Sequence, residues 1–396
     1  MNRPETVSAL SIRLPQADRS LETYKLSAPK SFPDRLSGPM NRIAFSAAHV
    51  VADPLADADP WLQAAIDWDK TIAYRERLWD LGLGVAEAMD TAQRGMGLDW
   101  PTSLELIRRS VGAAKARGDA LVFSGAGTDH LAPEAARSID DVIRAYEEQF
   151  SAIEAVGGRI ILMASRALAR VARSPDDYVT VYNRILRQAR EPVIIHWLGD
   201  MFDPALAGYW GTGDLDAAMD TAVSIINDNA SKVDGVKISL LDKDKEIAMR
   251  RRLDARVRMY TGDDFNYAEL IAGDEQGHSH ALLGIFDAIA PAASSALVSL
   301  AAGDLDAFHE VLAPTVPLSR HIFRAPTRFY KTGVVFMAYL NGHQDHFTMV
   351  GGQESARSTL HLAELFRLAD KAGLLRDPDL AVERMRFVLA THGVEA

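Results

Sequence analysis

Short apolar runs alternate with longer amphipathic stretches through most of the chain. The short runs are rich in β-branched residues, which is typical of buried strands. We expect eight such strands, at residues 42–46, 83–86, 120–124, 159–163, 192–197, 233–241, 257–260 and 280–284. Apolar residues recur at helical spacing between them, over residues 61–78, 103–116, 138–156, 175–189, 215–227, 244–253 and 267–272.

Strands that alternate with helices predict a parallel sheet, and eight of them predict a closed (β/α)₈ TIM barrel of the α/β class. We place this barrel at residues 41–291. Residues 1–40 contain two alternating runs, 10–14 and 21–26, which predict an N-terminal β-hairpin extension followed by a linker. We expect residues 292–396 to form a C-terminal helical region. The expected helices are 291–301, which begins one residue before this region, and 305–325, 330–340 and 355–372.

The composition narrows the class of protein. An apolar share of 48% and a charged share of 24% are typical of soluble globular proteins. The absence of cysteine excludes disulfides, thiolate metal sites and a cysteine nucleophile. The net charge of −11 argues against nucleic acid as a partner. The sequence contains no apolar run of membrane-spanning length and no secretory signal, so we expect a cytoplasmic protein that does not bind a membrane.

Residues 233–241 (VDGVKISLL) form an apolar run with Lys237 inside it. An unpaired ammonium is costly in such a run, and desolvation lowers the pKa of a lysine. A neutral amine is a nucleophile for carbonyl carbon. The alternative is a lysine at the end of a strand with its charged head in solvent. Because chemistry in a (β/α)₈ barrel lies at the carboxyl ends of the strands, we interpret Lys237, on the sixth strand, as a functional amine.

Other polar or small residues follow the carboxyl ends of the predicted strands. The candidates for a site with Lys237 are Glu87, Asp90, Thr91, Ala92, Gly127, Ser165, His196 and Asp200. The acids Asp263 and Asp264 also fall there, and we interpret both as residues that cap a loop.

Several segments in this order resemble one enzyme family. The segments are 84–86 with 90–93 and 104–107, then 126–128, 235–239 (GVKIS), 260–264 (YTGDD), 288–291 (AIAP) and 331–340. They resemble the Schiff-base lyases of the dihydrodipicolinate synthase and N-acetylneuraminate lyase family, over roughly residues 40–345. The glycine-hydrophobe-lysine segment is the most specific of them.

The resemblance implies an activity. Lys237 is expected to form an imine with the carbon of a keto group, which then acts as an electron sink for breaking or forming a C–C bond. We therefore expect a lyase or aldolase that acts on a small molecule, a 2-keto acid or a keto-sugar derivative. The resemblance implies no cofactor, and it implies a homo-oligomer, a dimer or a tetramer.

The sequence departs from the family in the loop after His196, which is much longer than the family's, and at two site positions. The family has a tyrosine as proton relay at the end of strand five, where this chain has His196. The family's carboxylate-binding loop has two threonines after a glycine, where this chain has Asp90, Thr91 and Ala92. Thr91 still offers a hydroxyl and Ala92 a backbone N–H. Asp90 would repel a carboxylate, which favours a polyol or sugar-like substrate.

The single residues keep alternatives open. With an ordinary pKa near 6.5, His196 is suited to proton transfer at neutral pH, or it is a core histidine bonded to the backbone. Asp200 could orient His196 or bind a substrate hydroxyl, or it is a solvated loop acid. Glu87 could act as an acid if it is unpaired, or it belongs to an internal ion pair. Gly127 and Ser165 are expected to contact the substrate.

A metal site is the alternative for the whole protein. His278 and His280 could join His196, Glu87 or Asp200 as ligands of a divalent metal. The protein would then be a metal-dependent isomerase or hydrolase of a sugar-like substrate, with Lys237 as an electrostatic stabiliser.

Overall fold

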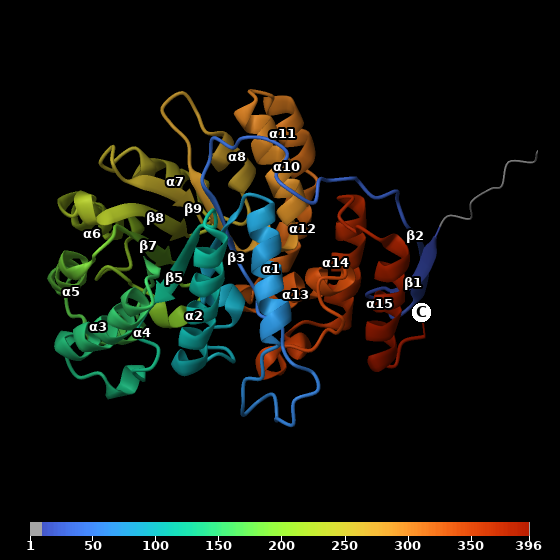
Figure 1. Ribbon diagram of the computed structural model, residues 1–396, viewed down its shortest axis with the longest axis horizontal. Coiled ribbons are helices and arrows are strands. Elements are labelled where there is room, and N and C mark those ends of the chain that lie inside the picture. Colours follow the sequence, from blue (N-terminus) through green and yellow to red (C-terminus); the bar gives the residue numbers. More distant parts are fainter. Residues whose placement is uncertain (1–9, 396) are drawn as a thin grey trace, which may run out of the picture.

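The computed structural model describes residues 10–395 and contains a closed barrel of eight parallel strands (Figure 1). Neighbouring strands follow the order β10-β3-β4-β5-β6-β7-β8-β9. The strands are β3 (Ala44–Ala47), β4 (Gly84–Glu87), β5 (Val122–Ala126), β6 (Arg159–Leu162), β7 (Val193–Leu198), β8 (Val233–Ser239), β9 (Arg258–Thr261) and β10 (His280–Leu283). The predicted (β/α)₈ barrel is confirmed, with each strand inside or within two residues of its expected range.

Helices join successive strands and cover the outside of the barrel. They are α1 (Trp68–Asp80), α2 (Trp100–Arg117), α3 (Ile139–Ala155), α4 (Arg166–Val171), α5 (Pro175–Gln188), α6 (Leu215–Asp228), α7 (Lys243–Arg250) and α8 (Tyr267–Ala272). The prediction of a helix from residue 61 was wrong. The Asp67 carboxylate accepts the N–H of Lys70 and caps α1, and Ile66 pairs as a β-bridge with Ala52.

Aromatic and aliphatic side chains fill the inside of the barrel. Phe45 and Phe123 meet edge to face with ring centroids 5.3 Å apart, and Ile194 and Tyr260 belong to the same cluster. Side chains of a strand alternate between its two faces, so the residue two positions after Ile194 also points inward. That residue is His196, and Lys237 lies beside it on β8. The apolar cluster therefore forms a floor beneath these two polar side chains.

The N-terminal hairpin consists of β1 (Ser11–Pro15) and β2 (Leu21–Lys25), which pair antiparallel as expected. It lies far from the barrel, against the last two helices (Figure 1). The Tyr24 hydroxyl donates to Asp370 at 2.7 Å, and Arg367 donates to the carbonyl of Pro15. The hairpin and the last two helices therefore form one layer at the side of the molecule.

The helices after the barrel are α9 (Ile285–Ala288), α10 (Ala290–Ala301), α11 (Leu305–Leu312), α12 (Thr315–Ile322), α13 (Tyr330–Leu340), α14 (Thr359–Lys371) and α15 (Pro378–Thr391). The prediction of one helix over residues 305–325 was wrong. The helix is interrupted at Pro314, which lacks an N–H, so α11 and α12 are separate. The expected boundary at residue 291 falls within the first turn of α10, and α15 was not predicted.

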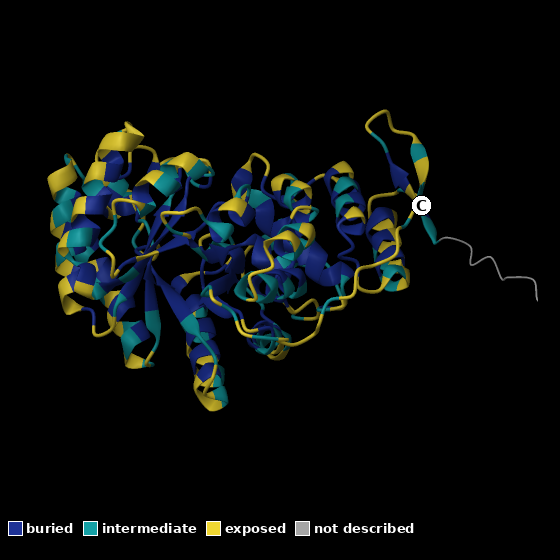
Figure 2. Cartoon of the chain, turned by 90° about the horizontal axis from the view of Figure 1, so that it is seen from above, coloured by how far each residue is buried: buried dark blue, intermediate teal, exposed yellow. Residues whose placement is uncertain are grey.

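Helix α13 lies between the barrel and the outer helices, and all its residues are buried. It contacts the 3₁₀ helix η1 (Asp90–Ala92), which follows β4 at the mouth of the barrel. Burial extends without interruption from the strands into these helices (Figure 2). Within residues 10–395, no helix has both the length and the apolar character needed to cross a bilayer.

Candidate active site

Lys237 lies near the carboxyl end of β8 and points into the barrel. Only 7% of the residue is exposed, and its strand neighbours are His196 on β7 and Tyr260 on β9. Among residues 10–395, no group forms a hydrogen bond or an ion pair with its amine. The sequence alternative of a strand-end lysine with its head in solvent does not describe this residue.

Burial and charge act on the amine in opposite directions. Burial lowers the pKa of Lys237, while the carboxylates of Asp264 and Asp90 act to raise it. Burial also raises the pKa of Asp264 to about 7, against the N–H of Ile285, which donates to this carboxyl group at 2.9 Å. Burial therefore acts against the charged form of both groups, while their mutual attraction acts in favour of it. The lowered pKa of Lys237 increases the share of the neutral amine, which is the nucleophilic form.

The glycine at position 262 makes room for this amine. A Cβ atom at Gly262 would lie 2.9 Å from Cε of Lys237 and 2.3 Å from Oγ of Ser239. Any larger residue would displace both side chains. This contact explains why the turn after β9 begins with glycine.

His196 is buried beside Lys237, and its Nε2 lies 3.2 Å from Oγ of Ser239. Burial, and then the charge of Lys237, lower the pKa of His196 well below 6.5. The expectation of an ordinary pKa near neutrality was therefore wrong. The imidazole is therefore neutral at pH 7, and its lowered pKa makes it a weak base.

The hydroxyl of Thr91 lies 2.8 Å from the hydroxyl of Tyr330, the first residue of α13. Tyr330 is buried, and its ring stacks on Phe323 with centroids 4.3 Å apart. Burial, followed by the nearby charge of Asp90, raises the pKa of Tyr330 well above 10, so the phenol stays protonated. Tyr330 was not predicted as a site residue, because no local sequence pattern relates it to a loop 239 residues earlier.

Two adjoining cavities open at the carboxyl ends of the strands, with volumes of about 80 and 150 Å³. Five residues line both, namely Asp90, Arg94, Arg166, Leu198 and Asp203. His196 and Gly127 line only the smaller cavity, and Tyr330 and Lys331 only the larger. Asp90 is thus one of the residues that the cavity beside His196 shares with the cavity beside α13; we refer to the two cavities together as the pocket.

Three other predicted residues are engaged in the scaffold. The N–H of Gly127 donates to the side chain of Gln149 at 2.6 Å. The hydroxyl of Ser165 caps α4 by accepting the N–H of Leu168, and it also contacts Thr128. Ala92 is fully buried within an apolar cluster. Gly127 remains a wall of the pocket, whereas Ser165 and Ala92 support the loops that form it.

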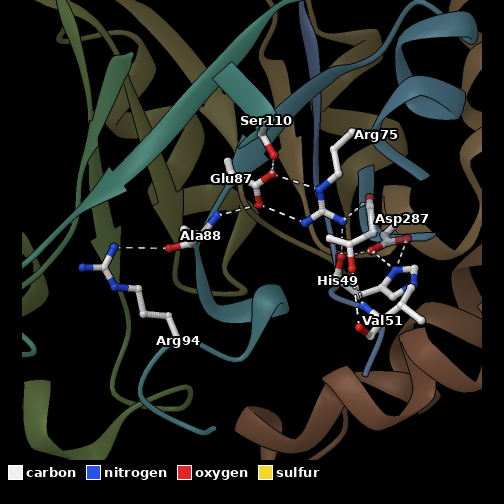
Figure 3. A network of polar contacts seen from close by, with 9 residues as sticks. His49, Val51, Arg75, Glu87, Ala88, Arg94, Ser110 and Asp287 are labelled. Atoms are coloured by element: carbon white, nitrogen blue, oxygen red, sulfur yellow. Dashed lines mark hydrogen bonds and ion pairs between the residues drawn. The ribbon is translucent and has the colours of Figure 1, made fainter. Parts of the chain in front are cut away.

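The interpretation of Glu87 as a substrate-binding acid was wrong. Glu87 is fully buried and forms a two-pronged ion pair with Arg75 of α1, with both N–O distances at 2.9 Å (Figure 3). Ser110 of α2 and the N–H of Ala88 also donate to it. Its carboxylate therefore faces the helices, and the internal ion pair that the sequence left open is what forms.

Asp200 also lies outside the pocket. The chain turns tightly after β7, because the N–H groups of Phe202 and Asp203 both donate to the carbonyl of Gly199. This turn leaves Asp200 exposed and brings Asp203 to the pocket, where it pairs with Arg166. Asp203, rather than Asp200, is the acid of this loop that lines the pocket.

The ligands proposed for a metal do not come together. His280 is the first residue of β10, and its Nδ1 accepts the N–H of Ile43 at the amino end of the barrel strands. His278 precedes His280 along the chain. His196, in contrast, lies toward the carboxyl end of β7, at the other end of the barrel. Within the described residues, no three histidine or acidic side chains are grouped to hold a metal ion.

The fold is shared with solved enzymes. YagE of Escherichia coli K12, a prophage protein of the dihydrodipicolinic acid synthase family solved with pyruvate, superposes with a TM-score of 0.65 at 12% identity over 85% of this chain and all of its own. Dihydrodipicolinate synthase of Acinetobacter baumannii, also solved with pyruvate, gives 0.62 at 17% identity over 84% and 99%. The enzyme of Aquifex aeolicus gives 0.62 at 13% over 85% and 100%.

These similarities define the class: a barrel of the dihydrodipicolinate synthase type with additional terminal elements. Residues 12–394 match the model of the family described as "Protein of unknown function (DUF993)", and the chain belongs to that family. No functionally curated protein matches the sequence.

Proposed function

We propose that this protein is a Schiff-base-forming lyase or aldolase that acts on a 2-keto acid or a keto-sugar derivative. The observation that carries the proposal is the amine of Lys237, which is buried, unpaired within residues 10–395 and lowered in pKa. The fold shared with dihydrodipicolinate synthases supports it, since two of those structures contain pyruvate.

The reaction begins when the neutral amine attacks the keto carbon. The resulting carbinolamine loses its hydroxyl as water after protonation, which leaves a protonated imine. In the lyase direction, we name the carbon next to the imine carbon α and the following one β. A base removes the proton of the hydroxyl at the β carbon, and the bond between the α and β carbons breaks. The β carbon leaves as an aldehyde, and the electron pair forms an enamine, which is then protonated and hydrolysed to free the amine.

The pocket offers groups for both kinds of proton transfer. The phenol of Tyr330 is protonated and can donate through its contact with Thr91. The neutral imidazole of His196 lines the pocket and is a weak proton acceptor. Asp90 lines the pocket and can accept hydrogen bonds from substrate hydroxyls, which suits a hydroxylated substrate.

Trapping the imine tests the proposal. The protein is incubated with a panel of keto compounds, including pyruvate and keto-sugars, then reduced with borohydride and weighed intact. We expect an adduct that maps to Lys237, that Lys237→Ala abolishes and that Lys371→Ala, a change of an exposed lysine, leaves in place. Tyr330→Phe should slow adduct formation about 10²-fold without preventing it. The absence of any adduct, or its persistence in Lys237→Ala, would refute the imine mechanism.

A further inference from the structure

A second buried lysine lies at the mouth of the barrel. Lys331, the second residue of α13, is only 3% exposed and lines the larger cavity. Its amine donates to the carbonyl of Arg328 and to the sulfur of Met96, each at 3.1 Å. A thioether is a weak acceptor, and no carboxylate among residues 10–395 pairs with this amine. The amine also lies over the ring of Tyr330, 5.2 Å from its centroid. A buried ammonium without a carboxylate partner is still costly unless a ligand supplies the missing charge.

The other charges around the pocket leave an excess of positive charge. Four cations line the two cavities (Arg94, Arg166, Arg328 and Lys331), against three acids (Asp90, Asp129 and Asp203). Two of the arginines are paired, Arg94 with Asp129 at 2.7 Å and Arg166 with Asp203. In the α13 part of the pocket, Lys331 and Arg328 therefore face only Asp90 as an unpaired acid. This local excess stands out in a chain of net charge −11.

Resting on the proposed function, we infer that Lys331, with Arg328, binds an anionic group of the substrate at the end remote from the keto carbon that Lys237 attacks. The substrate class is then a hydroxylated keto compound whose far end carries a carboxylate or a phosphate. Asp90, between the two lysines, binds the hydroxyls of its middle. Lys331 takes no part in the covalent steps and acts as a specificity-determining residue.

Protonation of the amine sets the pH range of this binding. Burial lowers the pKa of Lys331 to about 8, while Asp90 and Asp203 act to raise it and Arg166 and Arg328 to lower it. The ammonium is the form that binds an anion, so affinity is constant below pH 8 and falls about tenfold per pH unit above it.

The test compares ligands that differ in the remote anion. Borohydride trapping is measured as a function of concentration for pyruvate against 2-oxoglutarate, and for dihydroxyacetone against its phosphate. The wild type should reach half-maximal trapping at concentrations at least tenfold lower for the member of a pair with the remote anion. Lys331→Met should remove this preference, and Lys331→Arg should retain it. A larger preference within the pair of pyruvate and 2-oxoglutarate indicates a carboxylate. A larger preference within the pair of dihydroxyacetone and its phosphate indicates a phosphate.

The controls separate a binding role from a structural one. Lys371→Met, on the exposed end of α14, should behave as the wild type. If Lys331→Met does not fold, Lys331→Gln replaces it and should show the same loss of preference for the ligand with the remote anion. A preference that persists in Lys331→Met, an equal loss of trapping for all four ligands, or an adduct that maps to Lys331 would overturn the inference.

A second measurement is independent of the imine. Calorimetric titration of the full chain with inorganic phosphate should give binding that Lys331→Met weakens at least tenfold. If no keto compound is trapped but this effect appears, the proposed function fails and the anion site stands. If the wild type binds no phosphate and shows no preference in trapping, the anion site is refuted whatever the fate of the imine.

Discussion

Lys237 and Asp264 influence each other's protonation inside the barrel. The carboxylate of Asp264 acts to raise the pKa of the amine, and burial acts against the charge on both groups. The protonation state of each group therefore depends on that of the other. Burial is the largest effect on the pKa of the amine, and it favours the neutral, nucleophilic form.

Replacing Asp264 by asparagine tests this account. Loss of the carboxylate removes the charge that raises the pKa of Lys237, so the pKa of the amine should fall further. A lower pKa means that the neutral amine is reached at lower pH. The rate of imine trapping, followed from pH 5 to 10, should therefore rise at lower pH in Asp264→Asn than in the wild type.

Asp200→Asn is the matched control for that experiment, because Asp200 is exposed and lines neither cavity. Its trapping profile should coincide with that of the wild type. A shift of the Asp264→Asn profile to higher pH would contradict the electrostatic account of the amine.

At the scale of elements, one buried ion pair joins α1 to β4. Arg75 binds both oxygens of Glu87 and donates as well to the carbonyls of His49 and Thr71 (Figure 3). His49 in turn pairs through Nδ1 with Asp287, which belongs to α9. This network connects the segment after β3, helix α1, strand β4 and helix α9. It therefore fixes the end of β4, where the loop with Asp90 starts.

We predict that Arg75→Met destabilises the protein by about 3–5 kcal/mol, because it leaves the buried carboxylate of Glu87 without its partner. The free energy of unfolding is measured by chemical denaturation. Arg108→Met, which removes an exposed ion pair with Glu105, should cost less than about 1 kcal/mol. Equal losses in the two variants would show that the buried pair contributes no more than a surface pair.

The elements that the sequence predicted correctly are those set by local patterns. The barrel strands carry continuous apolar runs because both faces are buried, and such runs are visible without knowing any partner. The errors arose where one residue ends a periodic pattern. Asp67 delays the start of α1, and Pro314 separates α11 from α12, although the apolar spacing continues across both positions.

The candidate site was predicted only in part, for a related reason. Lys237 and His196 could be found because adjacent strands bring them together. The role of Glu87 depends on Arg75, which comes twelve residues earlier on a helix and leaves no mark on the strand pattern. Tyr330 and Lys331 come from outside the barrel, and their position depends on how α13 folds back over it. Contacts between distant elements are not encoded in local periodicity.

At the scale of the whole molecule, the loop before α1 exposes large apolar side chains. Leu55, Trp61 and Leu62 are 92%, 79% and 79% exposed within eight residues of each other. Exposed apolar groups of this size commonly mark contact surfaces. We predict that the protein is a homo-oligomer, a dimer or a tetramer, and that Trp61→Ser weakens its association.

Light scattering after size exclusion measures the mass of the particle. The wild type should show two or four times the mass of one chain, and Trp61→Ser a smaller mass at the same concentration. Leu305→Ser, at an exposed position of α11, serves as the control and should leave the mass unchanged. A monomeric wild type would refute the prediction.

The position of α13 also has a consequence for the order of synthesis. A ribosome releases the eight strands of the barrel, and with them Lys237, before it reaches Tyr330 and Lys331. A nascent chain can therefore close its barrel while the mouth still lacks the phenol and the second amine. The pocket becomes complete only when the final helices dock, so the emerging polypeptide acquires its full set of polar groups last.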